Sequence, residues 1–426
     1  MLTLRSGASR AVKHDTCDKM NAEWTPMRWP GSWKSPSALG LLKGTPINCL
    51  LVDKDAVLLP VIEQAKQAGL QVAEINSPPP GVAIVPGEWP GVAMARGGGA
   101  SAGPTGVPWV DSNSWKIRLE AARRPGTNIW VDVPPKGARV SASSYRTAIA
   151  DAGAHGGRWV ISLDAQLAAG IGDGKPDAVA AWKEITGAAG FFSKRDQWAT
   201  YVPEAVVGVV SDFAGDNEFM GQELLNLIGR TNQQYAVLLK TKLPKTLFGG
   251  LRAVIYADAQ PPEAELRKQI LDFVNAGGLL ITGPKWGVPP GIPAKDDHPR
   301  YAARTLGKGR IAVAKADPDD PYILANDSAL LISHRYELLR FWNGGAVGSY
   351  LTVAPDRKRA VAHLLFYADR GPDHASVRIA GRYRKVSLWT PDRPEPRPVE
   401  VEIQKDAVEL HLPAVSQYAA AELEAS

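Results

Sequence analysis

Val107-Pro-Trp-Val-Asp111, Asn128-Ile-Trp-Val-Asp132 and Arg158-Trp-Val-Ile-Ser-Leu-Asp164 are three apolar runs that each end on an aspartate. Each run is followed by a helical pattern, either directly or after a turn. Near-continuous apolar strands that alternate with helices are typical of a parallel sheet covered on both faces. In such sheets the carboxyl ends of the strands face the ligand crevice. The sequence therefore predicts that the three aspartates line one site.

Tryptophans are concentrated in the same half of the chain, since ten of the thirteen precede residue 200. Indole faces stack on the C–H faces of sugar rings, while carboxylates and amides bind sugar hydroxyls. This combination favours a polar, ring-shaped substrate, and a carbohydrate fits best. The alternative is that each indole fills the core, because large aromatic side chains bury ~150–250 Å² each. The candidate substrate-binding residues are Trp29, Trp33, Trp109, Asn113, Trp115 and Trp130.

Two pairs of these residues have a local context of their own. Trp29 and Trp33 lie in a segment rich in proline and glycine, so we expect them on a loop. Asn113 and Trp115 closely follow Asp111, and we expect them to contact sugar hydroxyls and a ring face.

Glycoside hydrolysis uses two carboxyl groups, ~5–5.5 Å apart for retention of configuration and ~6.5–9.5 Å apart for inversion. Ends of neighbouring strands can place two of Asp111, Asp132 and Asp164 in that range, so these three are the candidate catalytic residues. Asp111 and Asp132 each have a tryptophan two positions earlier, on the same side of the strand. An adjacent indole could desolvate one carboxyl and keep it protonated as the acid. The alternative is that each aspartate caps the following helix.

Composition limits the classes of function. The 426 residues are 45% hydrophobic and 22% charged, with a net charge of +5, which indicates two or three globular domains. Lysine and arginine are scattered among acidic residues, so we expect no nucleic acid partner. Cys17 and Cys49 are too few for a disulfide framework, and no Cys/His cluster predicts zinc. No phosphate-binding or dinucleotide-binding motif is present, so we expect neither metal nor cofactor.

Nothing in the sequence predicts a membrane segment, because no run of 18 apolar residues occurs. Residues 1–25 lack the apolar core of a signal peptide, and we expect them to be a poorly ordered leader. The compartment stays open: cytoplasmic by default, or secreted after removal of a signal.

The fold class is α/β, in three expected domains. Residues 26–203 alternate strand and helix, which predicts a (β/α) barrel, complete or trimmed, with a flavodoxin-like open sheet as the alternative. Residues 204–345 restart the alternation as a flavodoxin-like α/β domain. From 346 to 426 the pattern changes to a period of two, which predicts an antiparallel β-sandwich. Helices are expected at 115–123, 143–154, 177–192 and 329–342.

Four stretches, in this domain order, resemble the β-galactosidases of glycoside hydrolase family 42. They are Val209-Val-Ser-Asp212, Asp272-Phe-Val-Asn-Ala-Gly-Gly-Leu-Leu-Ile281, Leu306-Gly-Lys-Gly-Arg-Ile311 and Val361-Ala-His-Leu-Leu-Phe-Tyr367. The resemblance covers the second half of the chain and implies a carbohydrate substrate. It also implies a homo-oligomer, a trimer or dimer, formed through residues 204–345.

The first domain departs from that family. No Asn-Glu pair ends one of its strands, and Asn217-Glu218 lies in the second domain, so the resemblance supplies no catalytic residue. We therefore expect a glycoside hydrolase that uses the strand-end aspartates. The alternative is a non-catalytic carbohydrate-binding or scaffold protein with a degenerate barrel. Asp212, Asp216 and Glu218 form an acidic loop, which is weak support for a cation site.

Overall fold

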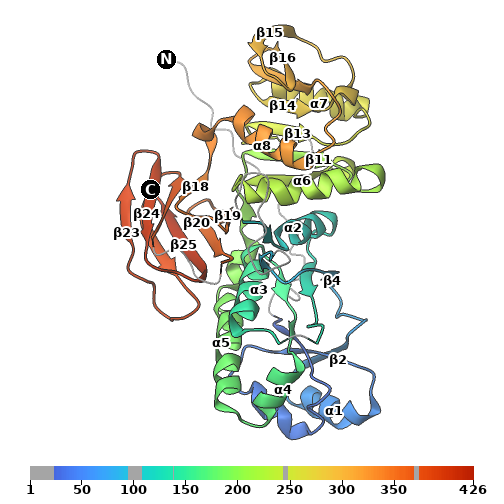
Figure 1. Cartoon of the computed structure of the whole chain (residues 1–426), viewed down its shortest axis with the longest axis vertical. Helices are drawn as coiled ribbons and strands as arrows, with labels where there is room; N and C mark the ends of the chain where they lie inside the picture. Colours follow the sequence, from blue (N-terminus) through green and yellow to red (C-terminus); the bar gives the residue numbers. More distant parts are fainter. Residues whose placement is uncertain (1–23, 95–107, 138, 243–247, 369–373) are drawn as a thin grey trace, which may run out of the picture.

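The computed structural model describes residues 24–94, 108–137, 139–242, 248–368 and 374–426. The expected leader (apart from residues 24 and 25), Cys17 and the first residue of the run that ends at Asp111 lie outside this part. In Figure 1 the parallel strands of the first half form one end of the long axis, and a second α/β layer forms the other end. The C-terminal strands pack at the side, between the two ends.

The first half contains a curved parallel sheet with one open seam. Its strands pair in the orders β3-β2-β1-β9 and β4-β7-β8. Val160, between β8 and β9, donates its N–H to the carbonyl of Val131 at 2.9 Å and so joins the two sheets. β3 and β4 do not pair, so the described strands form no closed barrel, and the sheet is a trimmed one. The bounds are β1 Pro26–Arg28, β2 Cys49–Val52, β3 Gln71–Glu74, β4 Val82–Pro86, β7 Asn128–Asp132, β8 Arg158–Trp159 and β9 Ile161–Ser162.

The helices of this half begin and end at the expected residues. In α3, Ser141 accepts a hydrogen bond from the N–H of Ser144 at 3.0 Å and caps the first turn. Gly156, with φ near +80°, ends the helix in a conformation that glycine adopts easily. The predictions for 115–123, 143–154 and 177–192 are confirmed. The bounds are α1 Leu59–Gln67, α2 Ser114–Arg123, α3 Ala142–Ala154, α4 Ala165–Gly172 and α5 Pro176–Ser193.

The second layer is a seven-stranded sheet in the order β12-β11-β13-β14-β17-β16-β15. Its five parallel strands follow the 2-1-3-4-5 order of flavodoxin-like folds, as expected, and β16 and β15 add an antiparallel edge. The parallel strands are buried apolar runs, because helices cover both faces. The bounds are β11 Val207–Ser211, β12 Tyr235–Leu239, β13 Ala253–Tyr256, β14 Leu279–Thr282, β15 Ile292–Asp297, β16 Tyr301–Leu306 and β17 Gly309–Ala314.

Three helices cover this sheet. α6 (Glu218–Arg230) and α8 (Pro321–Ile332) pack in one hydrophobic cluster, and α7 (Ala264–Asn275) packs in another, on the opposite face. The helix expected at 329–342 was wrong. The chain leaves the α-helix at Ser333, with φ near +81°, and then forms a strand, β18 (Leu339–Trp342).

The C-terminal part is an antiparallel sandwich of two sheets, in the orders β10-β19-β20-β25-β22 and β18-β21-β24-β23. Every second residue of β21 is buried, as the period of two predicts. β10 and β18 precede residue 346, so the sandwich takes strands from outside the range assigned to it. The bounds are β10 Val202–Pro203, β19 Val347–Val353, β20 Arg359–Phe366, β21 Ala375–Ala380, β22 Tyr383–Trp389, β23 Glu400–Ile403, β24 Ala407–Leu412 and β25 Gln417–Ala425.

Candidate functional site

Asp111 lies outside the parallel sheet. It ends β6 (Val110–Asp111), which pairs antiparallel with β5 (Gly91–Val92) in a separate two-stranded sheet. α2 begins three residues later. The expectation that Asp111 ends a strand is therefore confirmed, but the strand is a short one at the side of the parallel sheet.

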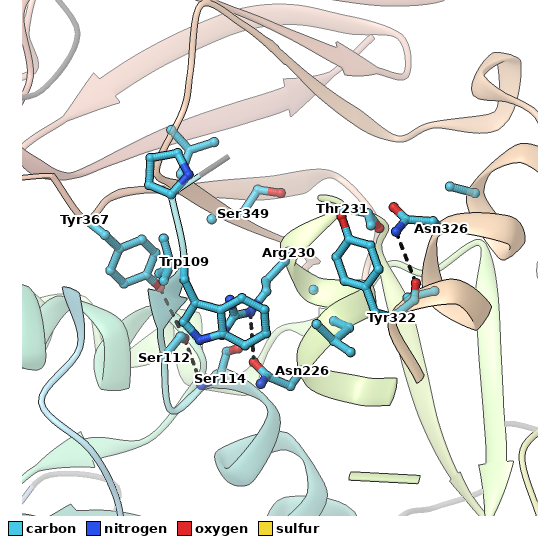
Figure 2. Close-up of a pocket in the computed structure, with 18 of the residues that line it drawn as sticks. Trp109, Ser112, Ser114, Asn226, Arg230, Thr231, Tyr322, Asn326, Ser349 and Tyr367 are labelled. Atoms are coloured by element: carbon cyan, nitrogen blue, oxygen red, sulfur yellow. Dashed lines mark hydrogen bonds between the residues drawn. The ribbon is translucent and has the colours of Figure 1, made fainter. Parts of the chain in front are cut away.

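A cavity of about 410 Å³ lies beside Trp109, where the three parts of the chain meet, and we call it the junction cavity. Its volume is within the ~300–1,000 Å³ range of small-molecule sites. Figure 2 shows residues from all three parts around it. The first half supplies Trp109, Ser112, Ser114, Arg118 and His155; α6 and α8 supply Asn226, Arg230, Tyr322 and Asn326; the sandwich supplies Ser349 and Tyr367.

One wall of the junction cavity is an indole held by a cation. The Arg230 guanidinium lies 3.6 Å from the centre of the Trp109 ring (Figure 2). Such cation–π contacts are worth ~0.5–2 kcal/mol and fix the orientation of the ring. Arg230 also donates to the Asn226 side chain at 3.4 Å. Trp109 is only half-buried, so its position and exposure fit the prediction of a substrate-binding indole.

Behind the cavity lies a buried carboxylate, Asp151. It accepts hydrogen bonds from the Tyr367 and Ser112 hydroxyls, both at 2.7 Å, and from the backbone N–H of Asn113 at 2.9 Å. The hydrogen bond from Tyr367 ties the sandwich to the first half. His155 contacts the Asp151 carbonyl through Nδ1 at 2.8 Å, and burial holds the pKa of His155 below its usual value. These contacts make the cavity wall rigid.

The pKa of Asp111 is raised above its usual value, chiefly because burial removes water from the carboxylate. The negative charge of Glu88 raises it further, while Arg230, Trp109 and Lys116 act in the opposite direction. A carboxyl with a raised pKa beside a second carboxylate is the arrangement that separates an acid from a base in glycosidases. Glu88 itself is exposed and pairs with Lys116 at 3.2 Å.

Asp132 and Asp164 are held by structural contacts instead. Asp132, at the end of β7, forms an ion pair with Arg28 at the end of β1. Asp164 caps α4 by accepting from the Leu167 N–H at 2.9 Å, which is the alternative that the sequence left open. Asp164 lines a cavity of about 860 Å³ to which neither Asp111 nor Asp132 contributes. Nothing in the described structure brings the three carboxyls to one cavity.

Three of the tryptophans expected at the substrate are in the core. The indole N–H of Trp29 donates to the Trp33 carbonyl, and that of Trp33 donates to the Ala168 carbonyl, both at 2.9 Å. Trp130, in the central strand β7, is 0% exposed. Trp29 and Trp33 lie on a loop, as expected, but both are buried, because this turn-rich segment folds back onto α4.

The two remaining candidates lie near the junction cavity but face elsewhere. Asn113 is fully buried and bonds to Asp151 and to the backbone of Glu88, so it positions the chain rather than meeting solvent. Trp115 packs against the hydrophobic cluster beneath α6.

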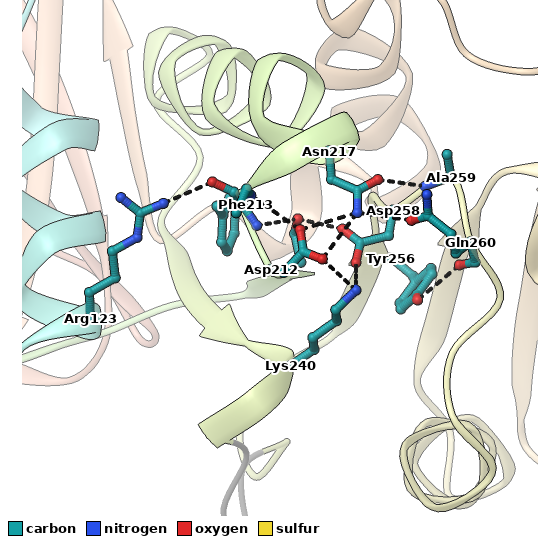
Figure 3. A network of polar contacts seen from close by, with 11 residues as sticks. Arg123, Asp212, Phe213, Asn217, Lys240, Tyr256, Asp258, Ala259 and Gln260 are labelled. Carbon is teal, nitrogen blue, oxygen red and sulfur yellow. Dashed lines mark hydrogen bonds and ion pairs between the residues drawn. The ribbon is translucent and has the colours of Figure 1, made fainter.

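Asp212, the first carboxylate of the acidic loop, forms an ion pair with a lysine that also pairs with Asp258 (Figure 3). Lys240 Nζ lies 2.6 Å from carboxylate oxygens of both Asp212 and Asp258. Asn217 donates to Asp212 as well, and the pKa of Asp212 is lowered by these hydrogen bonds, which outweigh its burial. Within the described ranges, no three His, Cys, Asp or Glu side chains are grouped to hold a metal ion.

Sequence reasoning missed three residues of the site: Glu88, Arg230 and Tyr367. Glu88 follows the end of β4 and precedes a tryptophan, so the strand-end pattern could have found it. Arg230 and Tyr367 come from α6 and the sandwich, and no local signal relates them to Trp109.

In the part of the chain that the structure describes, no helix is both long enough and apolar enough to cross a membrane.

No family model and no curated protein matches the sequence. Several solved structures that align with this chain are glycosidases. One is α-L-fucosidase isoenzyme 2 from Paenibacillus thiaminolyticus, with 13% identity over 74% of this chain and 62% of that one, and a TM-score of 0.49. A catalytic mutant of a GH42 β-galactosidase from G. stearothermophilus aligns with 9% identity over 86% and 65% of the two chains, with a TM-score of 0.44.

A β-galactosidase from Bacillus circulans sp. alkalophilus also aligns, with 11% identity over 86% and 66% of the two chains and a TM-score of 0.45. The family that the sequence resembles is thus among the structural matches. This chain spans less than two thirds of the length of each of these three proteins. Because their TM-scores are below 0.5, no residue here takes a role from them.

Proposed function

We propose that this chain binds a saccharide in the junction cavity and hydrolyses it as a glycosidase. One observation carries the proposal: Asp111, whose pKa is raised by burial, lies two residues after Trp109, which lines this cavity. Trp109 supplies a flat apolar face for a sugar ring. Ser112, Asn226 and Asn326 supply donors and acceptors for its hydroxyls.

In this proposal Asp111 is the general acid. Its raised pKa favours the protonated form, which can give a proton to the oxygen of the leaving sugar. Glu88, which forms an ion pair with Lys116, is the second carboxylate, acting as base or nucleophile. Arg230 lies close enough to lower the pKa of Asp111, so it stabilises the carboxylate that remains after proton transfer.

A second candidate function is saccharide binding without hydrolysis. It is favoured by the structural roles of Asp132 and Asp164, which leave only Glu88 to complete a catalytic pair. The carbohydrate partner is the same in both functions, and the difference lies in whether the bound saccharide is cleaved.

A panel of aryl-glycosides and polysaccharides separates the two functions. Hydrolysis of a panel member by the wild-type protein, with weaker binding in Trp109→Ala, supports a glycosidase that acts at the junction cavity. Binding without turnover, again weakened by Trp109→Ala, supports the second function. If Trp109→Ala binds every saccharide as tightly as wild type, the junction cavity is not the site. Trp342→Ala, a partly exposed tryptophan of the sandwich, is the matched control.

A further inference from the structure

A second hollow, of about 830 Å³, lies between the first half and the sandwich, away from the junction cavity. Residues 44–46, α5 and the 3-10 helix Asp196–Thr200 form one side. Residues 389–394 and Glu422 of β25 form the other. We call it the basic groove, and it shares no lining residue with the junction cavity.

The most constrained cation of the basic groove is Arg195. Its guanidinium carbon lies 4.0 Å from the ring centre of Phe191 and 4.4 Å from that of Trp389. Its Nη1 donates to the Phe191 carbonyl at 3.2 Å. No carboxylate of the described residues lies within ion-pair distance of it. The carboxylate of Glu422 acts on Arg195 electrostatically without forming an ion pair. A planar guanidinium held between rings, with no ion pair among the described residues, is suited to bind a carboxylate by two parallel hydrogen bonds.

Three further cations line the groove with Arg195, beside two carboxylates, Asp392 and Glu422. Lys183, Lys194 and Arg393 are exposed along the groove, and none forms an ion pair among the described residues. The acidic groups of the groove already have partners. Arg397 donates to Asp392 at 2.7 Å, and the Trp389 indole donates to Glu422 at 3.1 Å. The groove therefore attracts an anion.

The surfaces between these charges are flat and partly aromatic. Gly187 and Gly190 lie three residues apart on one face of α5; the backbone is bare at Gly187, whereas Pro46 lies 3.8 Å from the position of a Cβ atom at Gly190. A Cβ atom at Gly187 would meet nothing within 4 Å. Trp198 lines the groove and buries its indole N–H without a hydrogen-bond acceptor among the described residues. A bare floor, indoles and a carboxylate-binding guanidinium match sugar rings that carry acidic groups.

We propose that the basic groove binds an acidic saccharide, a chain of sugar rings that carry carboxylate groups. This second site does not depend on catalysis at the junction cavity. Each carboxylate would pair with Arg195 or with one of the exposed cations, and each ring would lie along the glycine face of α5.

Isothermal titration calorimetry with an oligogalacturonate tests this proposal against its methyl-esterified form, which keeps the rings and removes the charges. Wild-type protein should bind the acidic oligomer at least about tenfold more tightly than the ester. A tenfold difference in affinity corresponds to ~1.4 kcal/mol of binding free energy. Lys183→Glu and Arg393→Glu should each weaken binding by a similar factor. Lys405→Glu, an equal change of charge on an exposed sandwich turn, should not. Arg195→Lys keeps the charge but cannot form the two parallel hydrogen bonds of a guanidinium, so it should weaken binding.

Several results would overturn the proposal. Equal affinity for the ester would mean that the acidic groups are not recognised. A loss in Lys405→Glu as large as in the groove variants would mean that only net charge matters. Equal competition by single-stranded DNA would indicate a general polyanion site. If Trp109→Ala abolished binding, the oligomer would occupy the junction cavity instead. Should Arg195→Lys not fold, the two exposed charge reversals still decide the question.

Discussion

Two stretches of this chain have nearly the same sequence and different environments. Trp109-Val-Asp111 and Trp130-Val-Asp132 both end a strand, yet the first lies beside a cavity and the second inside a sheet. Trp109 is half-buried against Arg230, whereas Trp130 is 0% exposed. Asp111 is desolvated and forms no ion pair with the described residues, whereas Asp132 is paired with Arg28.

The difference comes from the neighbouring strands. β7, which holds Trp130, lies between β4 and β8, so its side chains are covered on both faces. β6, which directly follows Trp109, pairs only with β5 among the described strands, and α6 and the sandwich, distant in sequence, close around it. A strand-end Trp-x-Asp pattern therefore lies beside a cavity at β6 and in the core at β7, and the neighbouring strands make the difference.

The largest effect that we expect is the loss of stability when one of the two tryptophans is replaced. Trp130→Ala should lower the free energy of unfolding by ~3–5 kcal/mol, because it empties a fully buried indole site. Trp109→Ala should cost much less, since that indole is already half exposed. Chemical denaturation of both variants measures this. Equal losses would mean that the two indoles are buried alike and would break the comparison.

Asp132→Asn comes next. The change leaves the Arg28 guanidinium, whose Nε already lacks a partner among the described residues, without its carboxylate. Losing one side of a buried pair costs ~3–5 kcal/mol, and the partial exposure of Arg28 places this variant near the lower end. Asp132→Glu, which keeps the charge, is the control. A variant as stable as wild type would show that the ion pair contributes nothing.

Asp164→Ala should destabilise the protein by ~0.5–2 kcal/mol, through loss of the cap on α4. Asp164→Asn keeps an acceptor and should be nearly neutral. Thermal melting of the pair distinguishes a cap from a catalytic group. If both variants melted like wild type and both lost turnover, Asp164 would return to the list of catalytic candidates.

The smallest effect concerns pH. A raised pKa means that the folded protein holds the Asp111 proton more tightly than the unfolded chain does, in which the pKa of an aspartate is ~3.9. As pH rises from the pKa of the unfolded chain to the higher pKa of the folded protein, the unfolded chain releases its proton first, so wild-type protein loses stability. Asp111→Asn has no proton to lose at this position. Its free energy of unfolding relative to that of wild type should therefore be higher at pH 7 than at pH 3. A constant difference across that range would mean that the Asp111 pKa is not raised.

Local patterns in the sequence predicted most of the fold. Periodicity and caps placed α3 and α5, and the apolar runs of β11, β13 and β14 predicted the flavodoxin-like layer. The same approach was wrong at Ser333, where a positive φ ends α8 and no residue nearby signals it. The open seam between β3 and β4 is also invisible locally, because strand pairing depends on distant residues.

The candidate site was harder to predict than the fold. Trp109 and Asp111 could be proposed from their own pattern, but the same pattern also selected Trp130 and Asp132. Arg230 and Tyr367 complete the junction cavity from other parts of the chain, and only tertiary structure brings them there. The turn-rich context of Trp29 and Trp33 predicted a loop correctly, but nothing local predicted that their indoles are buried and donate to backbone carbonyls.

The most direct test of this account measures turnover and melting temperature for Asp111→Asn and Asp132→Asn on the same preparations, with a saccharide that wild type cleaves. We expect Asp111→Asn to lose ~10²–10⁴-fold in turnover without a lower melting temperature, because general acid catalysis contributes that factor. Asp132→Asn should melt earlier while its folded fraction keeps wild-type turnover. The reverse outcome, with catalysis lost in Asp132→Asn and retained in Asp111→Asn, would contradict the account.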